Sequence, residues 1–392
     1  MSTSSRAVLL GLGWFGIQVF WAFHGSTLPL FLADLTDSKL RISLILSLAG
    51  ISGFIVPPVV GYLSDRTGAR FGRRTPYIIV GMFGVLLAVL ALPRLGSFAL
   101  VVVVSALMYV FMRVAETPFL SLLPDITPPE QRSTASGIMN LVGSLGLILC
   151  FVAGSLIWER SHEAMFALVA VGCFGATATS IVLLREPAAE VSPSTERINL
   201  SAYVQSIVGE RNAVSLLTAQ FFWWLGFWMI SSFLILFVAE ELGVDEGQSF
   251  FVPVVFSVVA TAAMLPMGIL GDRFGRKQVL SAMIVVWAVS ALTVGFSRTF
   301  TQALATVAFS AVPFAAVMAV GYAFFLDLIP AGRTAEFIGI SVLTIAGAQF
   351  AGPLIGGALI DTFGYRSLFP VAAVFQLIGF SLLQRVRPPT AP

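Results

Sequence analysis

Twelve apolar runs, most of them about 20 residues long, constrain the fold of this 392-residue chain more than any other feature. A helix needs about 20 consecutive apolar residues to cross the hydrocarbon core of a bilayer. Only 11% of the residues are charged, against about 25% in soluble domains, and the charges lie between the runs. The sequence therefore predicts an all-α membrane protein with twelve transmembrane helices, at residues 8–32, 42–63, 76–93, 97–123, 135–157, 164–184, 213–239, 249–270, 279–297, 300–326, 335–360 and 366–384.

A charged motif that occurs twice divides the twelve runs into two sets of six. The first copy reads Gly61-Tyr-Leu-Ser-Asp65-Arg66, followed by Gly72-Arg73-Arg74. The second, shorter copy reads Gly268-Ile-Leu-Gly-Asp272-Arg273-Phe-Gly275-Arg276-Lys277. Further along each half, Asp125 and Arg132 are echoed by Asp327 and Arg333. This repeat predicts two parallel six-helix bundles, residues 1–185 and 212–392, joined by a linker over 186–211.

The positive charges favour one end of the predicted helices. With the N-terminus placed inside, the inner segments carry 15 Lys and Arg residues and the outer loops carry 6. Such an excess is typical of cytoplasmic loops. We therefore expect a multi-pass protein of the cell (inner) membrane, surrounded by lipid, with both termini in the cytoplasm. The first run, 8–32, is too long for the core of a cleavable signal peptide.

The repeated motif resembles the signature loops that follow the second and eighth helices of the major facilitator superfamily. In the first half, the chain is also similar to the sucrose-transporter branch and its glycoside–pentoside–hexuronide cation symporter relatives. The residues that carry this narrower resemblance are Gly16-Ile-Gln18-Val-Phe-Trp21-Ala22, Gly50 to Arg74 and Gln220-Phe-Phe-Trp-Trp224-Leu-Gly226. The resemblance implies a two-bundle transporter, a sugar or glycoside as substrate, and a monomer. One departure is that Leu120 stands two residues after Pro118, where sucrose transporters carry an arginine.

Ionisable side chains inside a predicted span are costly and mark function. Arg113 and Glu116 stand three residues apart in the fourth run, hence on one helix face. The arginine favours the charged carboxylate whereas burial favours the neutral acid, so a small change can load or release a proton. We therefore predict that Glu116 carries a coupling proton and that Arg113 regulates it; a static ion pair is the alternative. His24 either joins this proton path or packs as an ordinary hydrogen-bonded residue.

Amides and indoles inside the runs are candidates for binding a sugar, which offers hydroxyl groups and apolar C–H faces. Gln220, Trp223 and Trp224 share one face of the seventh run by their spacing. The predicted substrate-binding residues are Gln18, Trp21, Tyr109, Asn140, Gln220, Trp223, Trp224 and Gln349. The alternative is that the tryptophans pack against lipid or neighbouring helices.

The repeated hairpins are expected to act as gates at the cytoplasmic side. By resemblance, Asp65 meets the start of the eleventh helix and Asp272 the start of the fifth, where a carboxylate is favourable. Asp125 with Arg132, and Asp327 with Arg333, are expected to form matching clusters. The expected gating residues are Gly61, Asp65, Arg66, Gly72, Arg73, Arg74, Asp125, Arg132, Gly268, Asp272, Arg273, Gly275, Arg276, Lys277, Asp327 and Arg333. Positive charge that only fixes the topology is a compatible alternative.

The expected function is a proton-coupled symporter of a sugar or glycoside that works by alternating access. A proton-driven exporter of a drug-like or metabolite substrate is the alternative. Protons are favoured over sodium because the second run, 42–63, has no acidic residue, whereas sodium-coupled relatives typically use one there. The sequence has no nucleophile–base set, phosphate loop or metal cluster, and its net charge is only +2. We therefore expect no enzyme activity, cofactor, metal or nucleic-acid partner.

Overall fold

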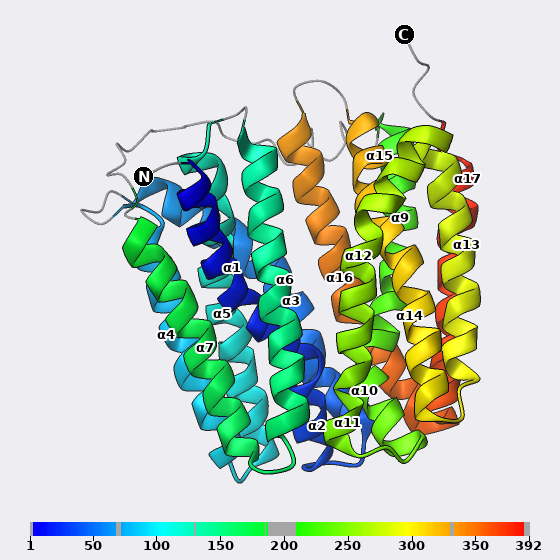
Figure 1. Cartoon of the computed structure of the whole chain (residues 1–392), viewed down its shortest axis with the longest axis horizontal. Helices are drawn as coiled ribbons and strands as arrows, with labels where there is room; N and C mark the ends of the chain where they lie inside the picture. The colour runs from blue at the N-terminus through cyan, green and yellow to red at the C-terminus, as the bar shows by residue number, and fades with distance from the viewer. Residues whose placement is uncertain are drawn as a thin grey trace. The chain divides into compact units, whose positions relative to one another are not determined.

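The computed structural model describes residues 3–67, 72–128, 131–184, 186, 209–329 and 333–387, and Figure 1 draws them as a set of long helices. The helices of the first half are α1 (Thr3–Gly25), α2 (Thr27–Ala33), α3 (Lys39–Arg66), α4 (Thr75–Ala91), η1 (Leu92–Arg94), α5 (Phe98–Ile126), α6 (Arg132–Ile157) and α7 (His162–Leu184). Those of the second half are α9 (Arg211–Ser231), α10 (Leu234–Leu236), η3 (Phe237–Glu241), α11 (Glu246–Ser249), α12 (Phe251–Phe274), α13 (Arg276–Gly295), α14 (Phe300–Ala316), η4 (Val317–Gly321), α15 (Tyr322–Asp327), α16 (Thr334–Phe363), η5 (Tyr365–Ser367) and α17 (Leu368–Gln384). Within these described ranges, 12 helices, some built from consecutive elements, are long and apolar enough to cross a membrane. The predicted all-α fold with twelve spans is confirmed.

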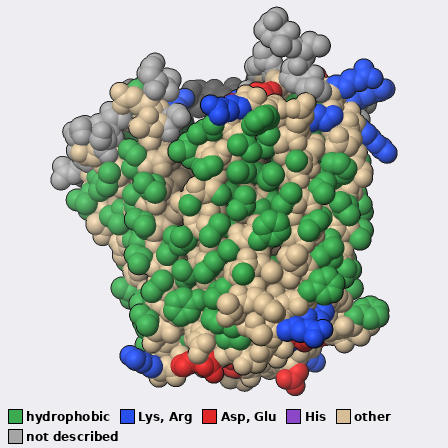
Figure 2. Space-filling view, turned by 45° about the vertical axis from the view of Figure 1, so that its right-hand side comes forward, with side chains coloured by type: hydrophobic (Ala, Val, Ile, Leu, Met, Phe, Trp, Pro, Cys, Tyr) green, Lys and Arg blue, Asp and Glu red, His purple; other side chains and the backbone are tan. Residues whose placement is uncertain are grey.

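The surface has the distribution of side chains that a bilayer requires. On the face drawn in Figure 2, hydrophobic side chains cover the middle, and Lys, Arg, Asp and Glu gather at the two ends. Large apolar side chains on the spans are strongly exposed, for example Leu265 at 72% and Val182 at 67%. Exposed apolar area on this scale is unfavourable in water and is expected where lipid covers it. The chain is a multi-pass integral membrane protein.

The chain forms two compact units, whose segments interleave along the sequence. Unit 1 comprises Met1–Asp37, Ile51–Ser194 and Asp245–Phe251. Unit 2 comprises Ser38–Gly50, Thr195–Val244 and Val252–Pro392. The division at 185 and 212 stays a prediction, and the linker over 186–211 lies mostly outside the described residues. Each unit takes one short segment from a span that the sequence assigns to the other half.

The two units repeat one packing scheme. In unit 1, α1 packs against α6 and α7, and α4 packs against α5 and α7. In unit 2, α9 packs against α16 and α17, and α13 packs against α14 and α17. The first and seventh spans, the third and ninth, and the fifth and eleventh therefore take equivalent places. The internal repeat read from the charged hairpins is thus also a repeat of helix packing.

Glycine permits a close approach between equivalent helices in each unit. A Cβ added at Gly146 of α6 would lie 2.5 Å from the carbonyl oxygen of Phe15 in α1. One added at Gly352 of α16 would lie 3.0 Å from the backbone nitrogen of Met229 in α9. Both distances are too short for a side chain, so the equivalent helix pairs pack backbone against backbone.

A carboxylate caps a helix start at the end of each unit opposite the charged hairpins. In unit 2, the two carboxylate oxygens of Asp361 accept the backbone N–H groups of Lys39 and Leu40, at 2.7 and 3.0 Å, where α3 begins. In unit 1, Glu159 accepts the backbone N–H of Gly247 in α11 at 3.0 Å. Free N–H groups and the helix dipole both favour a negative charge at these positions. Glu159 lies just after the end of α6 and Asp361 lies in the last turn of α16, so both caps are near the ends of equivalent spans.

Candidate functional site

A buried carboxylate with two charged or polar partners lies between α1 and α5 of unit 1. Glu116 Oε2 accepts a hydrogen bond from Arg113 Nη1 at 2.7 Å, and Glu116 Oε1 accepts one from Trp21 Nε1 at 3.0 Å. The side chains of Arg113 and Glu116 are only 16% and 9% exposed. Each carboxylate oxygen therefore has its own donor, which stabilises the charged form of a group that burial disfavours.

The indole of Trp21 contacts both members of this ion pair. The guanidinium carbon of Arg113 lies 4.7 Å from the centre of the Trp21 ring, as in a cation–π contact. The same ring meets His24 edge-on, with centroids 5.5 Å apart. Trp21, predicted as a substrate ligand, thus also belongs to the predicted proton site.

His24 and Tyr109 form the inner part of this network. His24 Nδ1 lies 2.6 Å from the hydroxyl oxygen of Tyr109, and both side chains are buried. Tyr109, Arg113 and Glu116 follow one another at helical spacing along α5, so α5 presents all three to α1. The structure therefore brings together five of the predicted residues, which we name the α1–α5 network: Trp21, His24, Tyr109, Arg113 and Glu116.

Two other predicted residues of unit 1 do not join this network. Asn140 on α6 is exposed and donates its amide hydrogens to the backbone oxygen and hydroxyl of Ser136, one turn earlier on its own helix. Gln18 is half-buried on α1, and no hydrogen bond to the network is found for it among the described residues. Helical spacing alone could not predict that Trp21 would join the α1–α5 network and that Gln18 and Asn140 would not.

The predicted face of the seventh span is divided among four neighbouring helices in unit 2. Gln220 Nε2 donates to Ser341 Oγ of α16 at 2.7 Å. Trp223 is 2% exposed and packs where α17 approaches, near Gly379. Trp224 turns towards α13 and α14 instead. Gln349, the remaining predicted residue, is buried on α16.

Aromatic rings from four helices gather around Trp224. Its ring lies 5.4 Å from Phe227, 6.4 Å from Trp287 and 6.0 Å from Phe314, measured between centroids. Phe256 of α12 completes the group, 5.0 Å from Phe314. We name these five residues the aromatic cluster. Sequence reasoning missed Phe256, Trp287 and Phe314, because the chain has 34 phenylalanines and 7 tryptophans and nothing in the sequence marks these three.

One buried amide in unit 2, that of Gln376, finds no hydrogen-bond partner in the part of the chain that the structure describes. Gln376 of α17 is fully buried, and neither its oxygen nor its nitrogen has a hydrogen-bond partner among the described residues. Burying such a group costs folding free energy.

The first charged hairpin is held by a cluster of ion pairs in unit 1. Arg74 is buried and contacts Asp65 at 2.7 Å and Asp125 at 3.2 Å. Arg73 contacts Asp125 at 3.0 Å, and this hydrogen bond raises the pKa of Arg73 above its ordinary value. Glu186 accepts the backbone N–H groups of Arg74 and Thr75 where α4 begins. The sequence did not point to Glu186, which stands at the start of the linker.

The second hairpin repeats this arrangement in unit 2. Arg276 contacts Asp272 at 3.1 Å and Asp327 at 2.7 Å. In each unit, therefore, one arginine joins two aspartates. One is the aspartate of the hairpin, and the other lies near the end of the second span after the hairpin: Asp125 in unit 1 and Asp327 in unit 2. The glycines of the two hairpins also match, since Gly72 and Gly275 both have a positive φ, 93° and 88°, which other residues adopt only with strain.

The expected pairs of Asp125 with Arg132 and of Asp327 with Arg333 stay predictions, whereas the structure pairs these aspartates with Arg74 and Arg276. Arg132 instead donates to the backbone carbonyls of Pro124 and Thr127, which end α5. Arg333 lies 3.8 Å from Glu210. Asp125 and Asp327 pair with the hairpin arginines instead, because the spans that carry these aspartates pack beside the hairpin in their own unit.

The remaining hairpin residues lie at the ends of their helices. Arg66 stacks over the ring of Tyr62 at 4.0 Å, and Lys277 donates to the carbonyl of Gln384 at 3.0 Å. Arg273 is exposed. Gly61 and Gly268 have room for a side chain, since no described atom would lie within 4 Å of an added Cβ.

At the opposite end of unit 1, titratable groups surround Asp34. Burial raises the pKa of Asp34, the nearby carboxylate of Glu246 raises it further, and His162 opposes the change. His162 Nδ1 lies 3.6 Å from Asp34 Oδ2, and its ring stacks on Trp158 at 3.8 Å. Trp158 Nε1 in turn donates to Glu246. Asp34 is therefore less freely solvated than its place beside a span end suggests.

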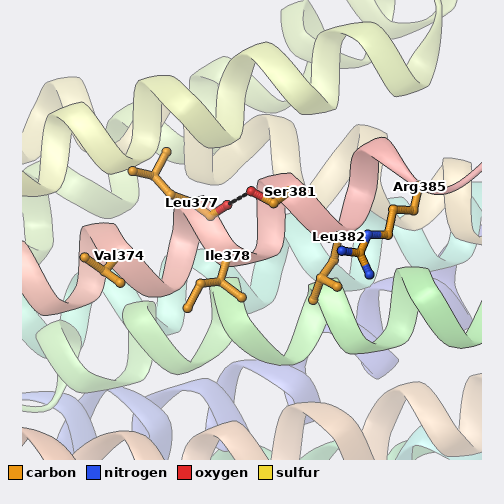
Figure 3. A pocket seen from close by; sticks show the side chains of 6 residues that line it. All are labelled: Val374, Leu377, Ile378, Ser381, Leu382 and Arg385. Atoms are coloured by element: carbon orange, nitrogen blue, oxygen red, sulfur yellow. Dashed lines mark hydrogen bonds between the residues drawn. The ribbon is translucent and has the colours of Figure 1, made fainter.

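Figure 3 shows a shallow groove along one face of α17. Its lining residues are Val374, Leu377, Ile378, Ser381, Leu382 and Arg385. The Ser381 hydroxyl donates to the Leu377 carbonyl at 2.9 Å, so it leaves the groove largely apolar. None of the predicted substrate residues lines this groove. Among the described residues, no group of three His, Cys, Asp or Glu side chains is placed to hold a metal ion.

The sequence profile of the Major Facilitator Superfamily matches residues 10–224 and 216–392. The chain belongs to the major facilitator superfamily. As a member of this superfamily it is a transporter, not an enzyme. Its fold is similar to that of the crystal structure of the nucleoside transporter NupG (D323A mutant), with a TM-score of 0.79 and 13% identity over 97% of this chain and 99% of that one.

Curated relatives within the superfamily match only part of the chain. The riboflavin transporter RibZ of Clostridioides difficile is 24% identical over 152 residues, which are 38% of this chain and 33% of the relative. The sucrose transport protein SUC3 of Arabidopsis thaliana is 28% identical over 162 residues, 36% of this chain and 27% of the relative. The chain thus matches a third or less of these relatives, whose names report two chemically different substrates.

Proposed function

We propose that this major facilitator superfamily member is a proton-coupled symporter of a sugar or glycoside that works by alternating access. The observation that carries the proposal is the buried Glu116 carboxylate, held by Arg113 at 2.7 Å and by Trp21 at 3.0 Å within a span. An ionisable group in such a position marks function by default. A proton is the simplest cargo for it.

The geometry suggests how proton and substrate can be linked. When Glu116 takes up a proton, its negative charge is lost, and the guanidinium of Arg113 can turn to another acceptor. A hydroxyl oxygen of a bound sugar can serve as that acceptor. Binding of the proton and of the sugar then favour each other, which is the requirement for symport.

Sugar recognition is supported by the mixture of amides and aromatic faces. The amides of Gln220 and Gln349 and the ring of Trp224 are suited to hydroxyl groups and C–H faces. The name of SUC3 adds support for this substrate class. We further propose that the hairpin clusters brace the cytoplasmic side during the cycle, with both termini in the cytoplasm, the cell membrane as location, and a monomer as the working state.

A second candidate is a proton-driven exporter of a flat aromatic metabolite or drug-like compound. It is favoured by the aromatic cluster, whose five rings offer stacking surfaces but no hydrogen-bonding partner specific for a sugar. The name of RibZ is consistent with such a substrate.

The test uses purified protein in liposomes that contain a pH-sensitive dye. Sucrose, maltose, other glucosides and pentoses are added one at a time, and internal acidification is recorded. We expect one of these sugars to drive proton entry in wild type and in Glu163→Gln, whose side chain is exposed. Glu116→Gln should abolish the response. Folded protein that responds to none of the sugars would refute sugar symport, and flat aromatic compounds would be tested next.

A further inference from the structure

We propose that Trp21 is a positioning residue that sets when Glu116 gains and loses its proton, and that it links this proton to occupancy of the transport site. The inference rests on the proton-coupled transport proposed above. It assigns to Trp21 a role different from that of a substrate ligand.

The first observation is the hydrogen bond itself. Trp21 Nε1 is a donor that cannot accept, and it points at Glu116 Oε1 while Arg113 occupies Oε2. A donor of this kind stabilises the carboxylate more than the neutral acid. Arg113 is always charged, so breaking its contact with Glu116 would separate two charges. The hydrogen bond from the neutral indole of Trp21 can be made or broken without doing so.

The second observation is that neighbouring side chains, including Arg113, hold the indole of Trp21 in place. Arg113 covers its face at 4.7 Å, while His24 and Phe20 meet it edge-on, with centroids 5.5 and 5.4 Å away. These contacts fix the ring plane and thereby aim Nε1 at the carboxylate. A rotation of the ring would change the surroundings of Arg113 and Glu116 at the same time.

The third observation is the difference in exposure between Trp21 and Glu116. Glu116 is buried, whereas Trp21 is only partly buried. A ligand can therefore stack on the indole without touching the carboxylate. If stacking turns the ring, Glu116 Oε1 loses its donor and the carboxylate takes up a proton more readily. Departure of the ligand restores the hydrogen bond and favours release of the proton.

Few other titratable groups face this site within unit 1. Arg113 lies on the same helix as Glu116, and α1 contributes His24, which is bonded to Tyr109. The packed helix α4 carries only Tyr77, which is hydrogen-bonded to Thr67. Beyond its first residue, α6 carries only Cys150, whose thiol donates to the carbonyl of Val19. Helix α7, which packs against α1, carries Cys173 in its interior, and η1, which contacts α5, carries Arg94. Trp21→Phe retains a ring beside Arg113 and His24, so loss of the indole N–H is its main change at Glu116.

The experiment measures the proton on Glu116 directly and needs no substrate. The full-length protein in lipid is titrated from about pH 4 to 10 while infrared difference spectra record the protonated carboxyl band. Glu116→Gln identifies the band by removing it. Trp21→Phe keeps an aromatic ring beside Arg113 but lacks the N–H donor. Trp14→Phe is the matched control, because Trp14 lies on the same helix and stacks on Phe119 at 6.4 Å.

We expect Trp21→Phe to move the midpoint of the Glu116 band to higher pH by roughly one unit, a tenfold change in proton affinity. Trp14→Phe should leave it unchanged. If Trp21→Phe does not fold, Trp21→Leu, which also lacks the donor, should show the same direction of change. Equal midpoints in wild type and the Trp21 variants would overturn the inference and leave the proposed function standing.

The remaining outcomes separate the two proposals. A shifted midpoint in protein that moves no protons with any sugar would support the role of Trp21 and refute sugar symport. A Glu116 band that is absent from wild type over the whole range would overturn the inference and proton coupling together.

Discussion

Unit 1 and unit 2 pack their helices by the same scheme but bury different kinds of side chain between them. Unit 1 buries an ion pair, a histidine and a tyrosine between α1 and α5. In unit 2, the span interiors at 251–270, 279–297, 300–326, 337–360 and 368–384 contain no Asp, Glu, His, Lys or Arg. Aromatic rings and amides occupy them instead. The two halves of a duplicated fold can therefore keep one packing scheme while one half buries ionisable side chains and the other buries aromatic rings.

The largest expected effect tests the aromatic half. Trp287 is 2% exposed and contacts Trp224, Phe227 and Phe314. Trp287→Ala should lower the free energy of unfolding by about 3–5 kcal/mol, because it leaves a cavity within the aromatic cluster. The pH midpoint of the Glu116 band should not move. Chemical denaturation and the infrared titration measure the two quantities.

Trp287→Phe provides the control, since it retains a ring and should recover most of the stability. The comparison between the units would fail if Trp287→Ala shifted the Glu116 midpoint as far as Trp21→Phe does. Proton chemistry would then depend on both halves.

A smaller effect of opposite sign is expected from the orphaned amide of unit 2. Gln376→Leu removes two buried polar atoms that have no hydrogen-bond partner among the described residues, so unfolding should cost about 1–2 kcal/mol more. In unit 1, Glu116→Leu should do the reverse, because it removes the carboxylate from a buried ion pair with Arg113. Denaturant midpoints of both variants check the contrast. A destabilised Gln376→Leu protein would mean that the amide is satisfied by a group it binds.

The smallest effect concerns pH and the end of unit 1. Because burial and Glu246 raise the pKa of Asp34, the folded protein releases this proton at a higher pH than the unfolded chain does. The stability that Asp34 contributes is complete below its ordinary value of 3.8 and is lost as the pH rises through the raised value. Asp34→Asn removes this loss, so the variant should gain stability relative to wild type between about pH 4 and pH 7.

The gain should be on the order of a few tenths of a kcal/mol, since Asp34 is nearly half exposed and solvent screens its interactions. Thermal unfolding at the two pH values measures it. Asp37→Asn, at an exposed neighbouring position, is the control for the loss of one negative charge at this end of unit 1. A gain of equal size in both variants would assign the effect to net charge.

The sequence predicts the fold almost completely, because span length and the twin hairpins each follow from local patterns. The pair of Arg113 and Glu116 was also predictable, since spacing within one helix fixes it. The bond from Trp21 to Glu116 was not, because it depends on how α1 packs against α5. The pairing of Asp125 was missed for the same reason: nearness in the chain favoured Arg132, whereas helix packing brought Arg74. The capping roles of Glu159 and Asp361 could have been predicted, since both residues lie near the ends of equivalent spans in the repeat.

The cap that Asp361 provides for α3 has a consequence for biosynthesis. Lys39 and Asp361 are separated by 322 residues, so the start of α3 enters the membrane long before its cap has been translated. Until then, its free N–H groups depend on water or lipid headgroups at the membrane surface. Unit 1 likewise lacks Asp245–Phe251 until the ribosome has passed the linker and the seventh span. Unit 1 therefore cannot finish folding when its own spans have been inserted, and the early segment Ser38–Gly50 has to wait for the later spans of unit 2.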